Sequence, residues 1–323
     1  MAPDDTALAS QVARLFHDRE MTRVQIAHRL GISRFRVARL LEQARQQGLV
    51  RIELRDIPAR DRETARAIEE AWGLDLCIVA SDGPNDDPVS SVGRLAGSVL
   101  QELITPTETI GIAWGSTVAA TVAEIPARVA PGISVVQLAG SSARVAQPHD
   151  PGELARVLAD RLGATCHPLY APAFVASAEV RAVLLGESEI SRTTDLFGAV
   201  TLAIVGIGEL SGSRDGSALV RSELLSPEDV RRLRRSGALG DLLVHAFDAR
   251  GRFIPDPLSD RAIAMTPEQL RRVPRVVAVA GGARKARAIA GALATGIVRM
   301  LITDGTAARE LLGNRGPQGV RRS

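Results

Sequence analysis

The sequence predicts an α/β protein with two domains, a small helical one and a larger, Rossmann-like one with a mostly parallel sheet. Its 323 residues exceed the usual length of a single domain. Residues 21–50 repeat apolar side chains at helical spacing, and from Leu76 onward short apolar runs alternate with helical segments. The expected boundaries are 1–55 for the helical domain, 56–74 for a linker and helix, 75–312 for the α/β domain and 313–323 for a flexible tail.

Two short helices joined by a tight turn are expected within residues 21–50. Thr22, followed three positions later by Gln25, is a capping-box pattern that begins the first helix. Gly31 supplies the turn, and Ser33 is a good N-cap for the second helix. The segment therefore predicts a helix-turn-helix.

A third helix and a wing would complete this small domain. An apolar stripe precedes the pair, Gly48 ends the second helix, and Leu49–Ile52 predicts a short strand or wing. The apolar positions expected to pack the three helices together are Leu8, Val12, Leu15 and Phe16, then Val24, Ile26, Ala27 and Leu30, then Val37, Leu40, Leu41 and Ala44.

Positive charge is concentrated in the small domain. Residues 11–52 hold nine arginines against three acidic residues, about +6, whereas the whole chain carries +3. A recognition helix needs hydrogen-bond donors at its N-terminal end, which enters the major groove of double-stranded operator DNA. An alternative is a helical dimerisation module with a solvated arginine face. The residues expected to contact DNA are Thr22, Ser33, Arg34, Arg36 and Arg39.

Composition predicts a cytoplasmic protein with no membrane segment. No signal peptide or apolar run of membrane-spanning length is visible, and apolar residues make up 45% of the chain, which is ample for a large core. Cys77 and Cys166 lack metal-ligand spacing, so we expect free thiols in a reducing compartment and no metal site.

Seven apolar runs predict the strands of the larger domain. Most are continuous rather than alternating, which is typical of a parallel sheet covered on both faces. The expected strands are Leu76–Ala80, Thr109–Ala113, Ile133–Leu138, Thr201–Val205, Leu242–Phe247, Val276–Ala280 and Arg299–Thr303.

Small and polar residues follow several of these strands, where open α/β sheets bind their ligands. Gly115, Ser116 and Thr117 open a helix after a strand, so backbone N–H groups and two hydroxyls offer an anion site. An ordinary N-capped turn is the alternative. Gly140 and Ser141 follow another strand and are a second candidate for contact with a ligand.

Two further strand ends carry glycine. Gly206-Ile207-Gly208 lacks the third glycine of a dinucleotide fingerprint, so we expect no nicotinamide cofactor. We expect no other cofactor either. Lys285 follows a Gly-Gly turn and is the only lysine among 40 basic residues. Lysine is a compact point charge, unlike the planar arginine fork. It could bind phosphate or form an imine. The alternative is a lysine without a functional role on a helix surface.

Acidic residues add one more candidate. Asp241 precedes an apolar run and could accept hydrogen bonds from sugar hydroxyls. His245 lies within that run and fits a core histidine. No second carboxylate or histidine base accompanies Lys285 in a recognisable motif, so no catalytic residue is assigned and an enzyme is not expected.

At these residues the chain resembles the SorC family of sugar-binding transcriptional regulators, from about residue 8 to 312. The similarity is carried by MTRVQIAHRLGISRFRVARLLEQARQQGLV, GIAWGSTVAATV, PLYAPAFV, AIVGIGEL, GALGDLLVHAFDARG and VAVAGGARKARAIAGALATGIVRMLITDGTAARELL. It implies a ligand domain related to sugar-phosphate isomerases and glucosamine-phosphate deaminases, a phosphorylated sugar as effector, and homodimers or homotetramers on a palindromic operator.

The resemblance also implies roles for single residues. The phosphate-binding turn corresponds to Gly115–Thr117, a phosphate-contacting arginine to Arg221, the acidic position that holds sugar hydroxyls to Asp241, and the lysine of the Gly-Gly turn to Lys285. The expected function is a transcriptional regulator of a carbohydrate operon. The alternatives are an isomerase or deaminase carrying a DNA-binding head, and a constitutive DNA-binding scaffold.

Overall fold

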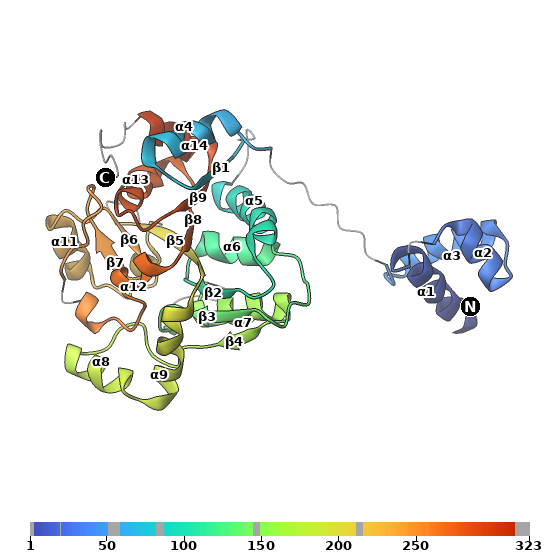
Figure 1. The fold of residues 1–323 in the computed structure, drawn as a ribbon, viewed down its shortest axis with the longest axis horizontal. Helices are drawn as coiled ribbons and strands as arrows, with labels where there is room; N and C mark the ends of the chain where they lie inside the picture. The colour runs from blue at the N-terminus through green and yellow to red at the C-terminus, as the bar shows by residue number, and fades with distance from the viewer. Residues whose placement is uncertain are drawn as a thin grey trace. The chain divides into compact units, whose positions relative to one another are not determined.

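The computed structural model describes residues 3–19, 21–50, 59–81, 87–144, 149–210, 216–256 and 258–313. The chain divides into two compact units, Met1–Asp56 and Ile57–Ser323 (Figure 1). Each unit has its own hydrophobic core.

The first unit contains the predicted three helices, α1 Pro3–His17, α2 Arg23–Leu30 and α3 Arg34–Gln46. The capping box is present: Gln25 N donates to Thr22 Oγ1 (3.3 Å) and Thr22 N donates to Gln25 Oε1 (2.9 Å). Gly31 adopts φ 65°, which ends α2 in the left-handed region that glycine favours. The buried core of this unit is Ala9, Val12, Ala13, Ile26, Val37, Leu40 and Ala44.

One prediction for this unit is wrong, and another falls partly on residues that the structure does not describe. Val24, expected to pack in the core, is 66% exposed. It lies two positions before the buried Ile26, and two residues turn an α-helix by roughly 200°, so their side chains point in opposite directions. Leu49 and Val50 form a bend, whereas Arg51 and Ile52 of the predicted wing lie outside the described residues.

The second unit is a mostly parallel α/β domain, as predicted. Its helices are α4 Arg62–Trp72, α5 Pro88–Leu103, α6 Ser116–Glu124, α7 Pro151–Leu162, α8 Ala178–Leu185, α9 Ser188–Thr194, α10 Ala218–Arg221, α11 Pro227–Arg235, α12 Pro267–Arg272, α13 Ala286–Ala294 and α14 Gly305–Gly313. Its strands are β1 Leu76–Ala80, β2 Thr109–Ile112, β3 Ser134–Gln137, β4 Thr165–His167, β5 Leu202–Glu209, β6 Gly240–Leu242, β7 His245–Phe247, β8 Arg275–Val279 and β9 Met300–Asp304.

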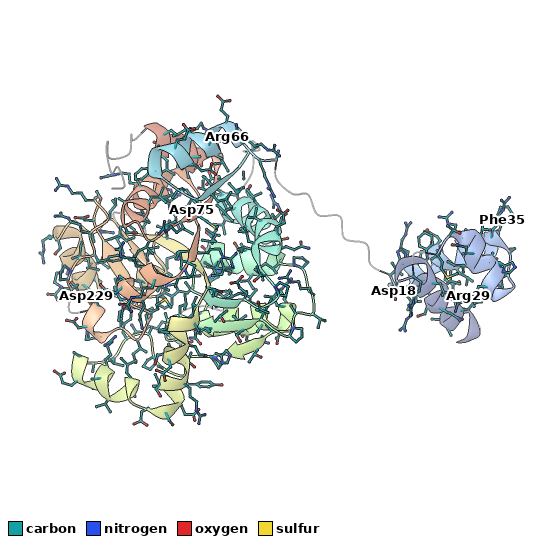
Figure 2. All side chains as sticks on the ribbon, viewed as in Figure 1. Asp18, Arg29, Phe35, Arg66, Asp75 and Asp229 are labelled. Carbon is teal, nitrogen blue, oxygen red and sulfur yellow. The ribbon has the colours of Figure 1, made fainter. Side chains whose placement is uncertain are left out.

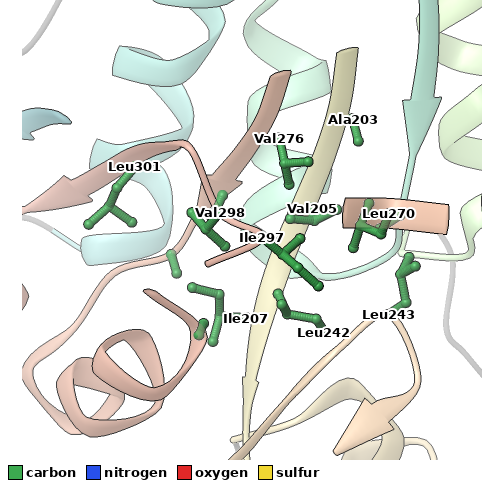
Figure 3. Packing of buried hydrophobic residues seen from close by; sticks show 14 of the residues in the cluster. Ala203, Val205, Ile207, Leu242, Leu243, Leu270, Val276, Ile297, Val298 and Leu301 are labelled. Carbon is green, nitrogen blue, oxygen red and sulfur yellow. The ribbon is translucent and has the colours of Figure 1, made fainter. Parts of the chain in front are cut away.

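Seven of these strands form one parallel sheet in the order β1-β9-β8-β5-β2-β3-β4, and β6 and β7 add an antiparallel hairpin to β5. Successive residues of β5 pack on opposite faces. Ala203 and Val205 lie in one cluster of buried residues (Figure 3), which also holds residues of α4, α13 and α14. Leu202 and Ile204 lie in another cluster with residues of α5, α6 and α7. Burial on both faces explains why the central strands are continuously apolar.

Three strand predictions needed correction. The single strand expected over Leu242–Phe247 is the end of β6, a turn and β7, because Leu243 adopts φ 57° and reverses the chain. Gly206–Gly208 lies within β5, since β6 pairs with residues 207–209 and prolongs that strand. The edge strand β4 was missed because its sequence, Thr-Cys-His, carries no apolar run. Among the described helices, none is both long and apolar enough to cross a membrane.

Candidate functional site

A recess lies beyond the carboxyl ends of the central strands β2, β5 and β8. It encloses about 400 Å³ of space that protein atoms do not fill, open solvent included. This is the edge at which open parallel sheets bind ligands. The residues that line it are Ala113, Trp114, Gly115, Ser116, Thr117, Gly206, Ile207, Gly208, Gly216, Ala218, Arg221, Asp241, Leu243, Val279 and Lys285.

One wall is the turn from β2 into α6. Gly115 adopts φ 126°, a conformation that L side chains rarely reach, and no side chain of the described residues caps α6 there. The N-terminal N–H groups of α6 therefore have no side-chain cap among the described residues, and N–H groups at such a helix end suit an anion. Trp114 Nε1 donates to Leu243 O (2.9 Å), which ties this turn to the β6–β7 hairpin.

Another part of the lining is a buried carboxylate. Asp241 is 3% exposed, lies opposite Gly208 in the β5–β6 ladder and accepts from Ser217 Oγ (2.6 Å). A Cβ at Gly208 would overlap the Asp241 carboxylate, so only glycine fits there. Burial raises the pKa of Asp241 to about 6, against the lowering effects of the Ser217 hydrogen bond, Lys285 and Arg221.

Two cations complete the recess. Lys285 Nζ donates to Ile207 O (3.0 Å). Burial lowers the pKa of Lys285, and Arg221 lowers it further, whereas Asp241 and Glu209 raise it. Arg221 brings its charge from α10. The recess therefore offers positive charge and N–H donors for an anion beside a carboxylate that accepts from hydroxyls.

The recess brings together six of the eight residues predicted to contact the effector, namely Gly115, Ser116, Thr117, Arg221, Asp241 and Lys285. Gly140 and Ser141 do not line it. Gly140 N donates to Ile263 O (2.8 Å), and Ser141 Oγ donates to Asp150 Oδ1 (3.0 Å) while it accepts from Gln137 Nε2 (3.1 Å). Effector contact by any of the eight stays a prediction.

Ser217 and Leu243 are among the residues of this region that the sequence did not indicate. Ser217 is fully buried and donates to Asp241, yet it lies among small polar residues with no spacing motif. Leu243 lines the recess with a left-handed backbone, and its apolar neighbours gave the pattern of a straight strand. No group of three or more histidine, cysteine, aspartate or glutamate side chains in the described ranges could hold a metal ion.

The residues predicted to contact DNA are all exposed on the first unit. The hydroxyls of Thr22 and Ser33 cap α2 and α3, because they accept from Gln25 N and Arg36 N respectively. Arg34 and Arg36 lie on the first turn of α3, and Arg39 lies one turn further. These arginines form a basic surface, and their contacts with DNA stay a prediction.

Comparisons with known proteins agree on a family. The family described as "Putative sugar-binding domain" matches residues 58–313. The chain is 31% identical to the erythritol catabolism regulatory protein of Brucella abortus (strain 2308), covering 97% of this chain and 98% of that relative. It is 28% identical to the deoxyribonucleoside regulator of Bacillus subtilis (strain 168), covering 95% and 97%.

Solved structures agree as well. The full-length sorbitol operon regulator SorC from Klebsiella pneumoniae superposes with a TM-score of 0.73 at 25% identity, covering 96% of this chain and 99% of that chain. Both units are thus included in the similarity. The chain belongs to the SorC family of sugar-binding transcriptional regulators.

Proposed function

We propose that a phosphorylated sugar binds in the recess and controls the binding of the small unit to operator DNA. The observation that carries the proposal is the combination of an uncapped helix N-terminus, two cations and a buried carboxylate around one cavity. The helix N-terminus and the two cations suit a phosphate, and the carboxylate suits hydroxyl groups. The relatives are named for erythritol, sorbitol and deoxyribonucleosides, which all carry hydroxyl groups.

The proposed regulator acts in the cytoplasm as a homodimer or homotetramer on a palindromic operator. Residues 1–55 bind DNA, and residues 75–312 bind the effector and assemble the oligomer. Half-sites must lie about one helical turn or a multiple apart, so a small rotation between subunits weakens operator binding. The effector shifts the equilibrium through its different affinities for the two arrangements. No turnover of the sugar is part of this proposal.

A thermal-shift screen tests the proposed effector class. The full chain is heated with sugar phosphates, the parent sugars and polyols, and inorganic phosphate. A ligand at a hundred times its dissociation constant adds about 2.7 kcal/mol, which raises Tm by roughly 5–10 °C for a domain of this size. A shift with one sugar phosphate but not its parent supports the proposal. A shift only with unphosphorylated sugars, or conversion of the ligand into product, contradicts it.

Arg34→Ala and Arg36→Ala are expected to weaken operator binding. Each side chain lies on the exposed first turn of α3, and a base contact contributes about 1–3 kcal/mol of discrimination. Fluorescence anisotropy measures the affinity of each variant for an operator duplex and for a scrambled duplex. Arg45→Ala is the matched control, because Arg45 lies in the last turn of α3 and pairs with Glu42 (3.0 Å). An equal loss on both duplexes would assign the arginine to phosphate contact.

Effector affinity is expected to fall as pH decreases through the pKa of Asp241, about 6. Hydroxyl donors bind the ionised carboxylate, so protonation weakens binding about tenfold between about pH 7.5 and about pH 5. The effector's phosphate also titrates near pH 6, so calorimetric titrations compare the wild type with Asp241→Asn. The variant should retain only the phosphate's pH dependence. Identical pH profiles would show that Asp241 does not bind the effector as a carboxylate.

A further inference from the structure

Phe35 is the most exposed large apolar side chain of α3, with 73% of its surface accessible. It is the second residue of the helix and does not belong to the core that Val37, Leu40 and Ala44 build with the other two helices. Figure 2 shows it at the edge of the small unit. Because the core does not include this ring, the ring is accessible to a partner, and aromatic side chains contribute strongly to the energetics of interfaces.

The surroundings of the ring are basic. The Arg34 guanidinium carbon lies 5.0 Å from the ring centroid, a cation–π arrangement, and Arg36 follows directly. Arg39 is exposed one turn further along the helix. A partner must therefore be anionic and must also present an apolar group within reach of the ring. The major groove of DNA meets both needs, because thymine 5-methyl groups lie between the phosphate backbones.

We propose that Phe35 recognises thymine by contact of its ring with the 5-methyl group in the major groove. The inference rests on the proposed function, since it requires α3 to bind the operator. The methyl group is the one apolar group on the major-groove edges of the bases, so this contact distinguishes thymine from the other bases. The same ring holds the guanidinium of Arg34 against its face, which orients that cation toward the neighbouring base or phosphate.

Replacement of single thymines by deoxyuridine tests the proposal, because it removes only the methyl group. Full-length protein first selects duplexes from a random-sequence pool, and each thymine of the selected site is then replaced in turn. We expect the wild type to bind about three- to tenfold more weakly when one particular thymine of a half-site is replaced. Phe35→Ala should bind the thymine and deoxyuridine duplexes equally.

Two variants serve as controls. Val24→Ala also removes an exposed apolar side chain from the small unit, and it should keep the wild-type ratio of thymine to deoxyuridine binding. Phe35→Leu keeps an apolar contact and should retain part of that ratio. Thermal unfolding is expected to be unchanged in each, because neither Val24 nor Phe35 is in the core.

The outcomes separate the inference from the function on which it rests. A wild type that is insensitive to every thymine replacement, or a ratio unchanged in Phe35→Ala and Phe35→Leu, overturns the thymine contact. An equal loss by Phe35→Ala on all duplexes also overturns it and assigns the ring to the DNA backbone. Failure of the wild type to select any sequence instead contradicts operator binding itself.

Discussion

Lys285→Ala is expected to weaken the binding of the sugar phosphate about 10- to 150-fold while it leaves operator affinity in the absence of effector unchanged. A hydrogen bond to a charged group contributes about 1.5–3 kcal/mol, which corresponds to this range. Lys285 lines the recess and is partly buried there, where low polarity strengthens its attraction for an anion. Calorimetric titration measures the affinity for the effector, and fluorescence anisotropy measures the affinity for the operator.

Lys285→Arg separates charge from shape at the same position. Arginine keeps the charge, but its planar fork places its donors differently from the single Nζ that donates to Ile207 O at 3.0 Å. We expect a weakened effector response here too. Arg284→Ala is the matched control, because Arg284 is the adjacent basic residue, is exposed and does not line the recess. Unchanged effector binding in both Lys285 variants would exclude the special role of the lysine.

The sequence predicted those parts of the fold that depend on neighbouring residues. The buried strands β1, β2, β3, β8 and β9 are continuous apolar runs, and each was predicted to within one residue at either end. The turn at Gly115–Thr117 was visible because a glycine followed by two hydroxyl residues after a strand has a local pattern. The caps of α2 and α3 were found for the same reason.

The features that the sequence did not predict depend on pairing between distant segments. Asp241 enters the recess because β6 turns back along β5 and places it opposite Gly208, which is 33 positions earlier in the chain. Ser217 reaches Asp241 from a third segment. The chain then reverses at Leu243 to form β7, and an apolar sequence pattern does not indicate a leucine with φ 57°. The location of Gly140 and Ser141 away from the recess likewise follows from contacts with Ile263 and Asp150.

Gly93→Ala and Gly97→Ala are expected to lower the free energy of unfolding by about 1–3 kcal/mol each. The two glycines lie one turn apart on α5 and face α6. A Cβ at Gly93 would lie 2.6 Å from the Cβ and 2.9 Å from the carbonyl carbon of Ala120, and a Cβ at Gly97 would lie 2.6 Å and 2.8 Å from the same atoms of Glu124. Backbone atoms cannot move aside as a flexible side chain can, so α6 must shift.

The clash must lower the free energy of unfolding by more than the helix propensity of alanine raises it. Alanine is about 0.8–1 kcal/mol more favourable than glycine within a helix. Urea unfolding measures the net change. Gly198→Ala is the matched control, since no atom lies within 4 Å of its added Cβ and its backbone is not left-handed; it should be neutral or slightly stabilising. The N-terminus of α6 forms the phosphate turn of the proposed site, so a shift of α6 should also weaken effector binding. A stable Gly97→Ala protein with wild-type effector affinity would show that α5 and α6 separate without moving the turn.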